Sequence, residues 1–305
     1  MSISIFGFQA LWSPYFFIAL TLLTVLFFLA ATKWRHKFKD SRPLTKKETI
    51  LFLTAMITIY IIKGSPVDVW GHILFSVHMV QMGIFYLLVP PLLIAAIPNY
   101  MWKAFLNIAV LKQVFNFLTK PLVALIVFNG AFSFYHIPLI FDTIKVDMAL
   151  HSVVTGSIFI LAFCMWWPLV NTLEGEYKLS GLKKVGYIFA DGILLTPACA
   201  LIIFANSPMY ETFFNGGAWL EAMALCVPAG TLQGLQSIGV TGPELFSNMP
   251  PLEDQQVGGV IMKIIQEIIY GYILAQVFFE WYRKEKSEED ALNASLYEAR
   301  ELRSE

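Results

Sequence analysis

The sequence has little charge for its length. Of its 305 residues, 14% are charged, 57% are hydrophobic and 15% are aromatic, whereas an ordinary soluble domain carries about 25% charged residues. The mean hydropathy is +0.64. A surface so poor in charge excludes an ordinary soluble protein, and a net charge of -1 offers no basic surface for nucleic acid. We therefore expect an integral membrane protein that does not bind nucleic acid.

Several motifs are also missing from the sequence. The three cysteines, Cys164, Cys199 and Cys226, include no C-x-x-C pair, which argues against a disulfide framework or a thiolate metal clamp. There is no nucleophile elbow, zinc-protease motif or phosphate-binding loop, so we expect the protein not to be an enzyme. Residues 1–13 lack a positive region, and a cationic stretch follows the first apolar run, so we expect no cleavable signal peptide.

The apolar residues gather into seven segments, which predict an all-α bundle of seven transmembrane helices in a single polytopic membrane domain. The spans are predicted at about 15–32, 49–62, 70–97, 121–135, 148–170, 185–204 and 257–282. Residues 99–120, with three lysines and apolar residues at helical spacing, predict a helix on the cytoplasmic surface. Residues 206–256 form a long outer segment, and 283–305 a charged cytoplasmic tail with a frayed helix.

The third span is too long for one straight crossing. From Trp70 to Pro98 a continuous helix would measure about 43 Å at 1.5 Å per residue, against a hydrocarbon core of roughly 30 Å. We therefore expect Pro90 and Pro91 to kink or end this helix near the inner face.

The positive residues fix the orientation of the bundle. Of the 21 lysines and arginines, 18 fall in the predicted inner loops and tail, and seven of these lie between Lys33 and Lys47. Because cytoplasmic loops are enriched in Lys and Arg, the N-terminus is predicted outside and the C-terminus inside. The two halves of the chain show no evident internal repeat, and they lack the paired interrupted helices typical of many transporters.

Four of the five histidines fall at the outer ends of the spans: His72, His78, His136 and His151. Imidazole is a ligand for copper, zinc or haem iron, and a methionine thioether selects copper(I). His78 shares a helix face with Met82, four residues on, whereas His72 is paired with Met79, seven residues on. The sequence thus indicates a metal or haem site at the outer face, against the alternative that these histidines simply occupy the polar interface.

Three ionisable residues lie within predicted spans. Asp191 is about two turns inside span six, and Lys263 and Glu267 are four residues apart in span seven. Charges at that depth are costly unless paired. We expect Asp191 to be buried and hydrogen-bonded or protonated, and Lys263 to pair with Glu267, with a polar path toward the outer site as the alternative. Gly156, Gly258, Gly259 and Gly271 are predicted to allow close helix packing.

A set of short motifs then gives the chain a family resemblance. They are Ile5-Phe-Gly-Phe-Gln-Ala-Leu-Trp-Ser-Pro14, His78-Met-Val-Gln81, Val89-Pro-Pro-Leu-Leu93, Tyr135-His-Ile-Pro138, Trp166-Trp-Pro168 and Asp254-Gln-Gln-Val-Gly-Gly-Val-Ile-Met262. In their order and spacing they resemble the Bacillus-type CtaG family, the multi-pass assembly factors of cytochrome c oxidase. The resemblance covers nearly the whole chain.

This resemblance implies a location and a role. It implies a multi-pass protein of the bacterial plasma membrane that is needed to make active caa(3)-type cytochrome c oxidase. Its partners would be oxidase subunits, a copper donor protein and membrane lipid, and it would help copper reach the buried copper centre of the oxidase. In the histidine-rich branch of the family a second histidine follows four residues after His78 and His151, where this chain has Met82 and Thr155. A transient copper contact is therefore expected, rather than a tight preformed site.

The leading hypothesis is an assembly factor whose outer histidines, with Met79, Met82 and Asp254, contact copper or the nascent oxidase. Two alternatives remain open. One is a haem-binding membrane protein in electron transfer or haem modification, because paired histidines hold haem in such bundles. The other is a small-molecule transporter.

Overall fold

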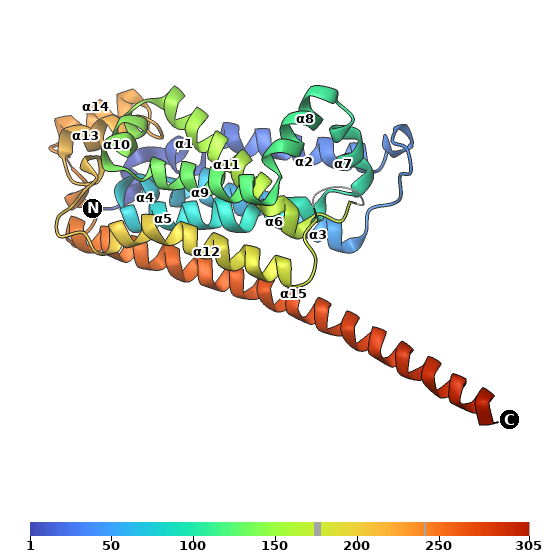
Figure 1. Cartoon of the computed structure of the whole chain (residues 1–305). Coiled ribbons are helices and arrows are strands. Elements are labelled where there is room, and N and C mark those ends of the chain that lie inside the picture. Colours follow the sequence, from blue (N-terminus) through green and yellow to red (C-terminus); the bar gives the residue numbers. More distant parts are fainter. Residues whose placement is uncertain (174–177, 241, 305) are drawn as a thin grey trace.

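Every regular element that the computed structural model describes is a helix (Figure 1). The structure describes residues 1–173, 178–240 and 242–304. Within them the chain runs through fifteen α-helices and five short 3-10 or π segments. The all-α class predicted from the sequence is confirmed.

Five helical stretches in the described ranges are long and apolar enough to cross a bilayer. They are Ile3–Ala31, which contains η1 (Ile3–Phe6), α1 (Gly7–Trp12) and α2 (Pro14–Ala31); Phe75–Ala96, which contains α5 (Phe75–Gly83), η3 (Ile84–Leu88) and α6 (Val89–Ala96); α11 (Met148–Val170); α12 (Leu182–Ile203); and the first part of α15 (Pro251–Ser304). A multi-pass membrane protein follows from these lengths and hydropathies.

Two bent helix pairs raise the number of candidate spans to seven. α3 (Lys46–Gly64) meets α4 (Pro66–Ile73) at 48°, and α8 (Ala109–Leu118) meets α9 (Pro121–Tyr135) at 80°. Alone, α9 has 15 residues and is about 22 Å long, which is short for a membrane core of about 30 Å.

The ends of the bundle differ (Figure 1). One end carries the N-terminus, α1, α10 (Pro138–Val146), α13 (Gly216–Met223) and α14 (Ala229–Ser237), and the other carries α7 (Asn99–Leu106) and α8. We call the first the outer end, after its predicted orientation. There Phe6, Val69, Trp219 and Phe246 belong to a separate hydrophobic core that joins α1, α4 and the segment after α12. That segment, predicted only as a long outer stretch, folds as a cap that also includes η4 (Glu211–Phe213) and η5 (Pro243–Leu245).

The single helix predicted over 70–97 is wrong in two places. The chain is extended at Leu74, where α4 ends and α5 begins, and the segment Ile84–Leu88 widens into a π-turn. The π-turn comes directly before Pro90 and Pro91, which lack an N–H and whose rings clash with the preceding turn. The prolines thus distort the helix before them, whereas α6 itself continues through them to Ala96.

Two further helix predictions need correction. The surface helix predicted over 99–120 is two helices, α7 and α8, because the chain leaves the helix at Asn107 and is extended at Ile108. Asn favours helix ends because its side chain competes for backbone hydrogen bonds. The last helix begins at Pro251 rather than near 257 and continues as one helix through Ser304. Residues 272–304 contain neither Gly nor Pro, so nothing in the sequence ends it.

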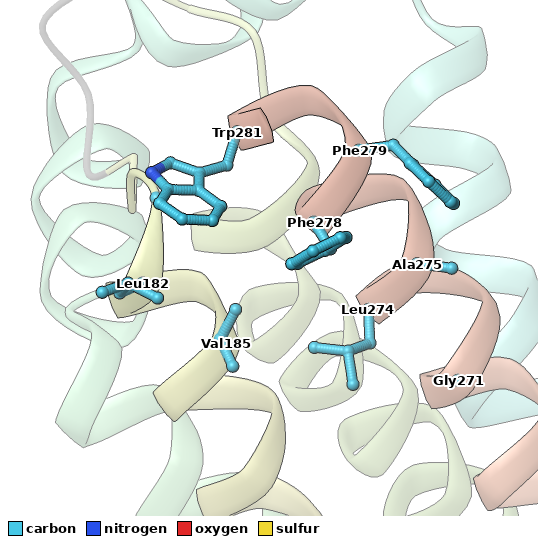
Figure 2. A pocket seen from close by; sticks show the side chains of 9 residues that line it. Leu182, Val185, Gly271, Leu274, Ala275, Phe278, Phe279 and Trp281 are labelled. Carbon is cyan, nitrogen blue, oxygen red and sulfur yellow. The ribbon is translucent and has the colours of Figure 1, made fainter. Parts of the chain in front are cut away.

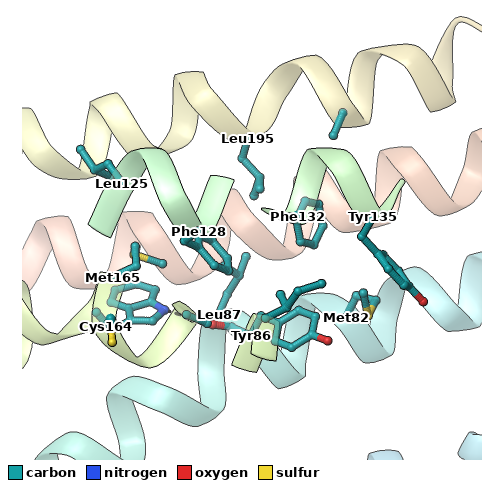
Figure 3. Close-up of a cluster of buried hydrophobic side chains, with 14 of the residues drawn as sticks. Met82, Tyr86, Leu87, Leu125, Phe128, Phe132, Tyr135, Cys164, Met165 and Leu195 are labelled. Atoms are coloured by element: carbon teal, nitrogen blue, oxygen red, sulfur yellow. Dashed lines mark hydrogen bonds between the residues drawn. The ribbon is translucent and has the colours of Figure 1, made fainter. Parts of the chain in front are cut away.

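The last helix packs against α5 and α12 together. Gly258 and Gly259 make this possible, since a Cβ at Gly258 would lie 2.9 Å from Phe75 and one at Gly259 would lie 2.7 Å from Ile203. The packing role predicted for Gly156 and Gly271 is wrong, because a Cβ at either would meet nothing within 4 Å. The main core lies between these helices, α9 and α11, and includes Met82, Tyr86, Phe128, Phe132 and Met165 (Figure 3).

Candidate functional site

The four outer histidines come from four different elements at the outer end. His72 lies in the last turn of α4, His78 in α5, His136 directly after α9, and His151 in the first turn of α11. His72, His78 and His136 are 4%, 3% and 5% exposed, and His151 is partly buried. The remaining histidine, His36, is exposed in the loop after α2. The fold therefore buries three of the four outer histidines and partly buries the fourth, which would not be expected of residues that merely line the polar interface.

His72 and His151 form one pair. Their ring centroids are 6.4 Å apart, with an angle of 54° between the ring planes. The Nδ1 atom of His72 makes a 2.9 Å hydrogen bond with the carbonyl oxygen of Asp68, one turn earlier in α4. This bond fixes the orientation of the His72 ring, and Nε2 is the ring nitrogen that remains without a hydrogen-bond partner among the described residues.

His78 and His136 both contact the ring of Phe141. The ring of Phe141 is 5.2 Å from that of His78 and 6.2 Å from that of His136. Tyr135 contacts both histidines, at 6.3 Å and 5.1 Å between ring centroids. Nδ1 of His136 is held at 2.8 Å by the carbonyl oxygen of Phe132. Burial lowers the pKa of His136 from 6.5 to about 4, so its ring is neutral at neutral pH.

Each of the four rings keeps a buried nitrogen that has no hydrogen-bond partner in the described part of the chain. These atoms are Nε2 of His72, His78 and His136, and Nδ1 of His151. The hydroxyl of Tyr135 is also buried and also has no hydrogen-bond partner among the described residues. A buried polar atom without a partner costs about 1–3 kcal/mol, so such atoms are uncommon unless water or a ligand satisfies them. Four of them in one corner of the bundle make this corner the candidate functional site.

A buried lysine lies in the same corner. Lys145, from α10, is 1% exposed, and its Nζ is 3.5 Å from the carbonyl oxygen of Gly71, the residue before His72. The same Nζ lies over the rings of Phe213 and Phe141, at 5.3 Å and 6.0 Å from their centroids. Burial and, to a smaller extent, the charge of Lys63 lower the pKa of Lys145 from 10.5 to about 7. The sequence pattern alone indicated no role for Lys145.

Gly71 holds this lysine in position. A Cβ at residue 71 would lie 2.0 Å from Oε1 of Gln81, so only glycine allows α4 and α5 to approach so closely. Gln81 is itself buried, and its amide donates hydrogen bonds to the carbonyl oxygen of Ile62 and the carboxylate of Asp68. The carbonyl oxygen of Gly71 thus faces Lys145 while the other side of the glycine faces Gln81.

The segment after α12 closes the corner from the outside. The hydroxyl of Tyr210 donates a 2.8 Å hydrogen bond to the carbonyl oxygen of His136, and its ring stacks on Phe75 with centroids 4.6 Å apart. The carboxylate of Asp142 accepts hydrogen bonds from the backbone amides of Glu211 and Thr212. These contacts bring Phe213 to 6.1 Å from the ring of His78.

The other predicted metal-site residues lie deeper or serve other contacts. Met79 and Met82 are 0% and 2% exposed, and both belong to the main core. A Cβ at Gly258 would lie 3.2 Å from Met79, so Met79 packs toward α15. The carboxylate of Asp254 accepts hydrogen bonds from the amides of Phe75 and Ser76 and from the Ser76 hydroxyl. It caps the first turn of α5, the helix that carries His78.

Among the described residues, no three His, Cys, Asp or Glu side chains lie close enough together to hold a metal ion. The structure thus presents the histidines as a pair, His72 with His151, and two single rings around Phe141. A two-ligand contact suits copper(I), which binds imidazole and thioether, better than it suits zinc in a closed four-ligand site.

The comparison with protein families gives one result. The model of the cytochrome c oxidase caa3 assembly factors (Caa3_CtaG) matches residues 25–284. The chain belongs to the Caa3_CtaG family. No curated protein and no solved structure matches it. The predicted family resemblance is confirmed, as is the predicted location of a multi-pass protein of the bacterial membrane.

This Caa3_CtaG member has Met82 and Thr155 at the two positions where the family resemblance implies histidine in a histidine-rich branch. Met82, in place of one histidine, lies in the core with Tyr135 (Figure 3). Thr155, in place of the other, donates its hydroxyl hydrogen to the carbonyl oxygen of His151, and its own carbonyl oxygen accepts a hydrogen bond from Tyr86. Thr155 therefore packs α11 against η3 and leaves the outer histidines as the candidate ligands.

The polar residues of this Caa3_CtaG chain within the membrane form two separate groups. Asp191 is 1% exposed, and its carboxylate accepts hydrogen bonds from Asn129 and the hydroxyl of Tyr270, which confirms that it is buried and hydrogen-bonded. Lys263 forms the predicted ion pair with Glu267, at 3.0 Å. In the described contacts neither group reaches the outer histidines. Asn129 and Tyr270 could not be assigned from the sequence, because the contact joins three helices.

Proposed function

We propose that this oxidase assembly factor passes copper toward the copper centre of a caa3-type cytochrome c oxidase through a transient contact with its outer histidines. The observation that carries the proposal is the set of four free ring nitrogens buried in one corner at the outer end. Family membership supports the coarser role in oxidase assembly. Copper is here the cargo, and the role requires no catalysis.

The chemistry of the corner favours a brief contact over storage. Imidazole nitrogens are good ligands for copper(I), and the free atoms of His72 and His151 belong to neighbouring rings. The cationic form of Lys145 interacts with His72, His78 and His151 and therefore opposes a second positive charge beside them. A site with few ligands and a cation at its edge accepts copper and also gives it up.

The partners follow from this role. A copper donor protein would deliver the ion to the outer end, an oxidase subunit would receive it, and lipid surrounds the bundle. Tyr210 and Phe213 stand between the histidines and the outside, so the cap segment after α12 is where a donor or a subunit would meet the protein.

The test uses three histidine variants. His78→Ala and His151→Ala should leave the protein inserted and abundant, while the copper content and activity of the oxidase fall. His36→Ala is the matched control, because His36 is exposed and lies in the loop after α2. Each variant is measured for membrane-inserted protein beside oxidase copper, haem and activity.

Three outcomes would contradict the proposal. Full oxidase activity in a variant with both His78 and His151 replaced would rule out the proposed copper contact of the histidines. A Soret band in the optical spectrum of the purified protein would favour haem binding instead. If activity falls only as far as the amount of protein falls, the histidines serve packing alone.

A further inference from the structure

A groove runs between α12 and α15 on the outside of the bundle. It consists of two hollows, of about 470 Å³ and about 230 Å³, that share Gly271 and Leu274 and are therefore continuous. Figure 2 shows the larger hollow, with Leu182 and Val185 from α12 and Phe278 and Trp281 from α15. This part of the groove is apolar and lies toward the end of α12 opposite the histidines.

The smaller hollow is polar on one side. Lys263 and Glu267 line it, and the side chain of Glu267 is 66% exposed while that of Lys263 is 31% exposed. Nζ of Lys263 lies 3.1 Å from the hydroxyl oxygen of Thr196, which is seven residues from the end of α12 and so about 10 Å inside the span. An exposed carboxylate at this depth would face lipid, where a charge costs a few kcal/mol.

Gln266 adds an unsatisfied donor to the same hollow. It is 0% exposed and its Oε1 is 3.3 Å from Nζ of Lys263, but its Nε2 has no partner in the described part of the chain. Glu267 already pairs with Lys263, but a lipid acyl chain offers its exposed carboxylate no second donor and offers Gln266 no acceptor. The lining of this hollow therefore fits a polar group better than an acyl chain.

The residues at the centre of the groove are small and have open space beside them. Gly271 lies where the two hollows meet, and a Cβ there would meet nothing within 4 Å. Ala275, one turn further, also lines the groove and is exposed. Small residues on a helix surface let another helix approach closely in a membrane. No helix of the described chain takes this position.

We propose that the groove between α12 and α15 binds one transmembrane helix of another polypeptide, which carries a hydrogen-bonding side chain at the depth of Glu267 and Gln266 and large apolar side chains beside Gly271. Its identity as a helix of an oxidase subunit rests on the proposed function. The polar hollow sets the depth of the bound helix, and the apolar hollow supplies contact area. The surface is separate from the outer histidines, so docking and copper contact are distinct events.

The least buried span of a second copy of this chain does not supply such a helix. The span Ile3–Ala31 is the least buried of the candidate spans. Its hydroxyls within α2, Thr21 and Thr24, donate to the carbonyl oxygens of Phe17 and Leu20 and have no donor left for Glu267. Two copies placed groove to groove would leave two hollows facing each other.

The test is photo-crosslinking in membranes that contain the full-length protein and tagged oxidase subunits. A benzophenone amino acid is placed at Phe189 or Ile193, which line the groove and are 58% and 68% exposed, and as a control at Leu22 of α2, which is 58% exposed. We expect cross-links to an oxidase subunit from positions 189 and 193 and none from position 22. Cross-links from the groove only to lipid or only to a second copy would overturn the proposal.

A filling variant distinguishes the groove from the rest of the surface. Gly271→Leu should lower the cross-link yield about tenfold, because the new side chain occupies the space of the bound helix. Gly156→Leu is the matched control, since its Cβ also meets nothing within 4 Å but it lies on α11, and it should leave the yield unchanged. Ala275→Leu fills the same groove if Gly271→Leu fails to insert.

The result is independent of the histidine test. If the groove cross-links only to lipid while His78→Ala and His151→Ala still lower oxidase copper, the docking proposal fails and the copper proposal stands. If the subunit cross-link forms normally in the histidine variants and oxidase copper is unchanged, the copper proposal fails and the docking surface stands.

Discussion

The carboxylate of Asp254 accepts two hydrogen bonds from Ser76, one from its backbone amide and one from its hydroxyl. The two residues are 178 positions apart in the sequence. The second carboxylate oxygen accepts the amide hydrogen of Phe75 at 2.6 Å. The start of the last helix therefore caps the helix that carries His78, and the break at Leu74 depends on a distant residue.

Replacing Asp254 should lower stability. Asp254→Ala leaves the amides of Phe75 and Ser76 buried without an acceptor, and we expect a loss of about 2 kcal/mol in the free energy of unfolding. Unfolding in detergent, followed by circular dichroism, measures it. Glu253→Ala is the control, because Glu253 is exposed at the neighbouring position and should cost little. Equal stability of the two variants would mean that Asp254 is not a cap.

Gly71 should tolerate no side chain. Gly71→Ala places a Cβ 2.0 Å from Oε1 of Gln81, so the buried amide or the helix must move, and we expect a loss of about 1–3 kcal/mol. Gly130→Ala, on α9, has open space around its Cβ and should be neutral. The same detergent unfolding assay compares them, and a neutral Gly71→Ala would show that Gln81 repacks freely.

Lys145 should make stability depend on pH. Its pKa is about 7 in the folded protein against 10.5 when unfolded, so between these values the unfolded chain holds the extra proton. Stability therefore rises as the pH increases from about 7 to 10.5, by at most on the order of 5 kcal/mol. Lys63, Asp68, Asp142 and Cys226 act on the same charge. Unfolding midpoints across this range should rise in the wild type and be flatter in Lys145→Met.

Lys145 should also limit how long copper is held. Removing its charge in Lys145→Met takes away the repulsion that the histidine pair experiences, so we expect copper(I) affinity to rise about tenfold. Competition with a copper(I) chelator measures the affinity in detergent. Lys63→Met, whose side chain is partly exposed and pairs with Asp68 at 3.6 Å, should have a smaller effect. Weaker copper binding by Lys145→Met would contradict this account of release.

The predicted orientation can be tested directly. In a chain whose three cysteines are replaced by alanine, Leu44→Cys should resist a membrane-impermeant thiol reagent in intact cells, because the basic loop after α2 is predicted to be cytoplasmic. A cysteine at Ile238, which is 67% exposed in the cap, should react. Modification at position 44 from outside would reverse the topology.

Hydropathy predicted the bounds of the helices that are apolar along their whole length. The predicted bounds 121–135 and 148–170 coincide with α9 and α11, and 15–32 lies within a residue of α2. The burial of Asp191 and the pairing of Lys263 with Glu267 followed from the cost of charge in lipid. These features depend on local composition, which a sequence displays.

The missed features depend on contacts between distant segments. The break at Leu74 is stabilised by Asp254, which is far from Leu74 in the sequence. The buried Lys145 contacts Gly71 and Phe213, which are both far from Lys145 in the sequence. The histidines could be grouped by predicted depth, but their division into a pair and two single rings is set by Phe141. Periodicity says which face of a helix is apolar and not which helix lies opposite.

The last helix, α15, is continuous from the outer end of the bundle to beyond its inner end. With 54 residues it is about 80 Å long, and Figure 1 shows its inner part projecting beyond the bundle. Its outer end holds α5 through Asp254, and its middle rests on α12. One uninterrupted helix therefore connects the part that projects beyond the bundle with the contact that positions α5, the helix of His78.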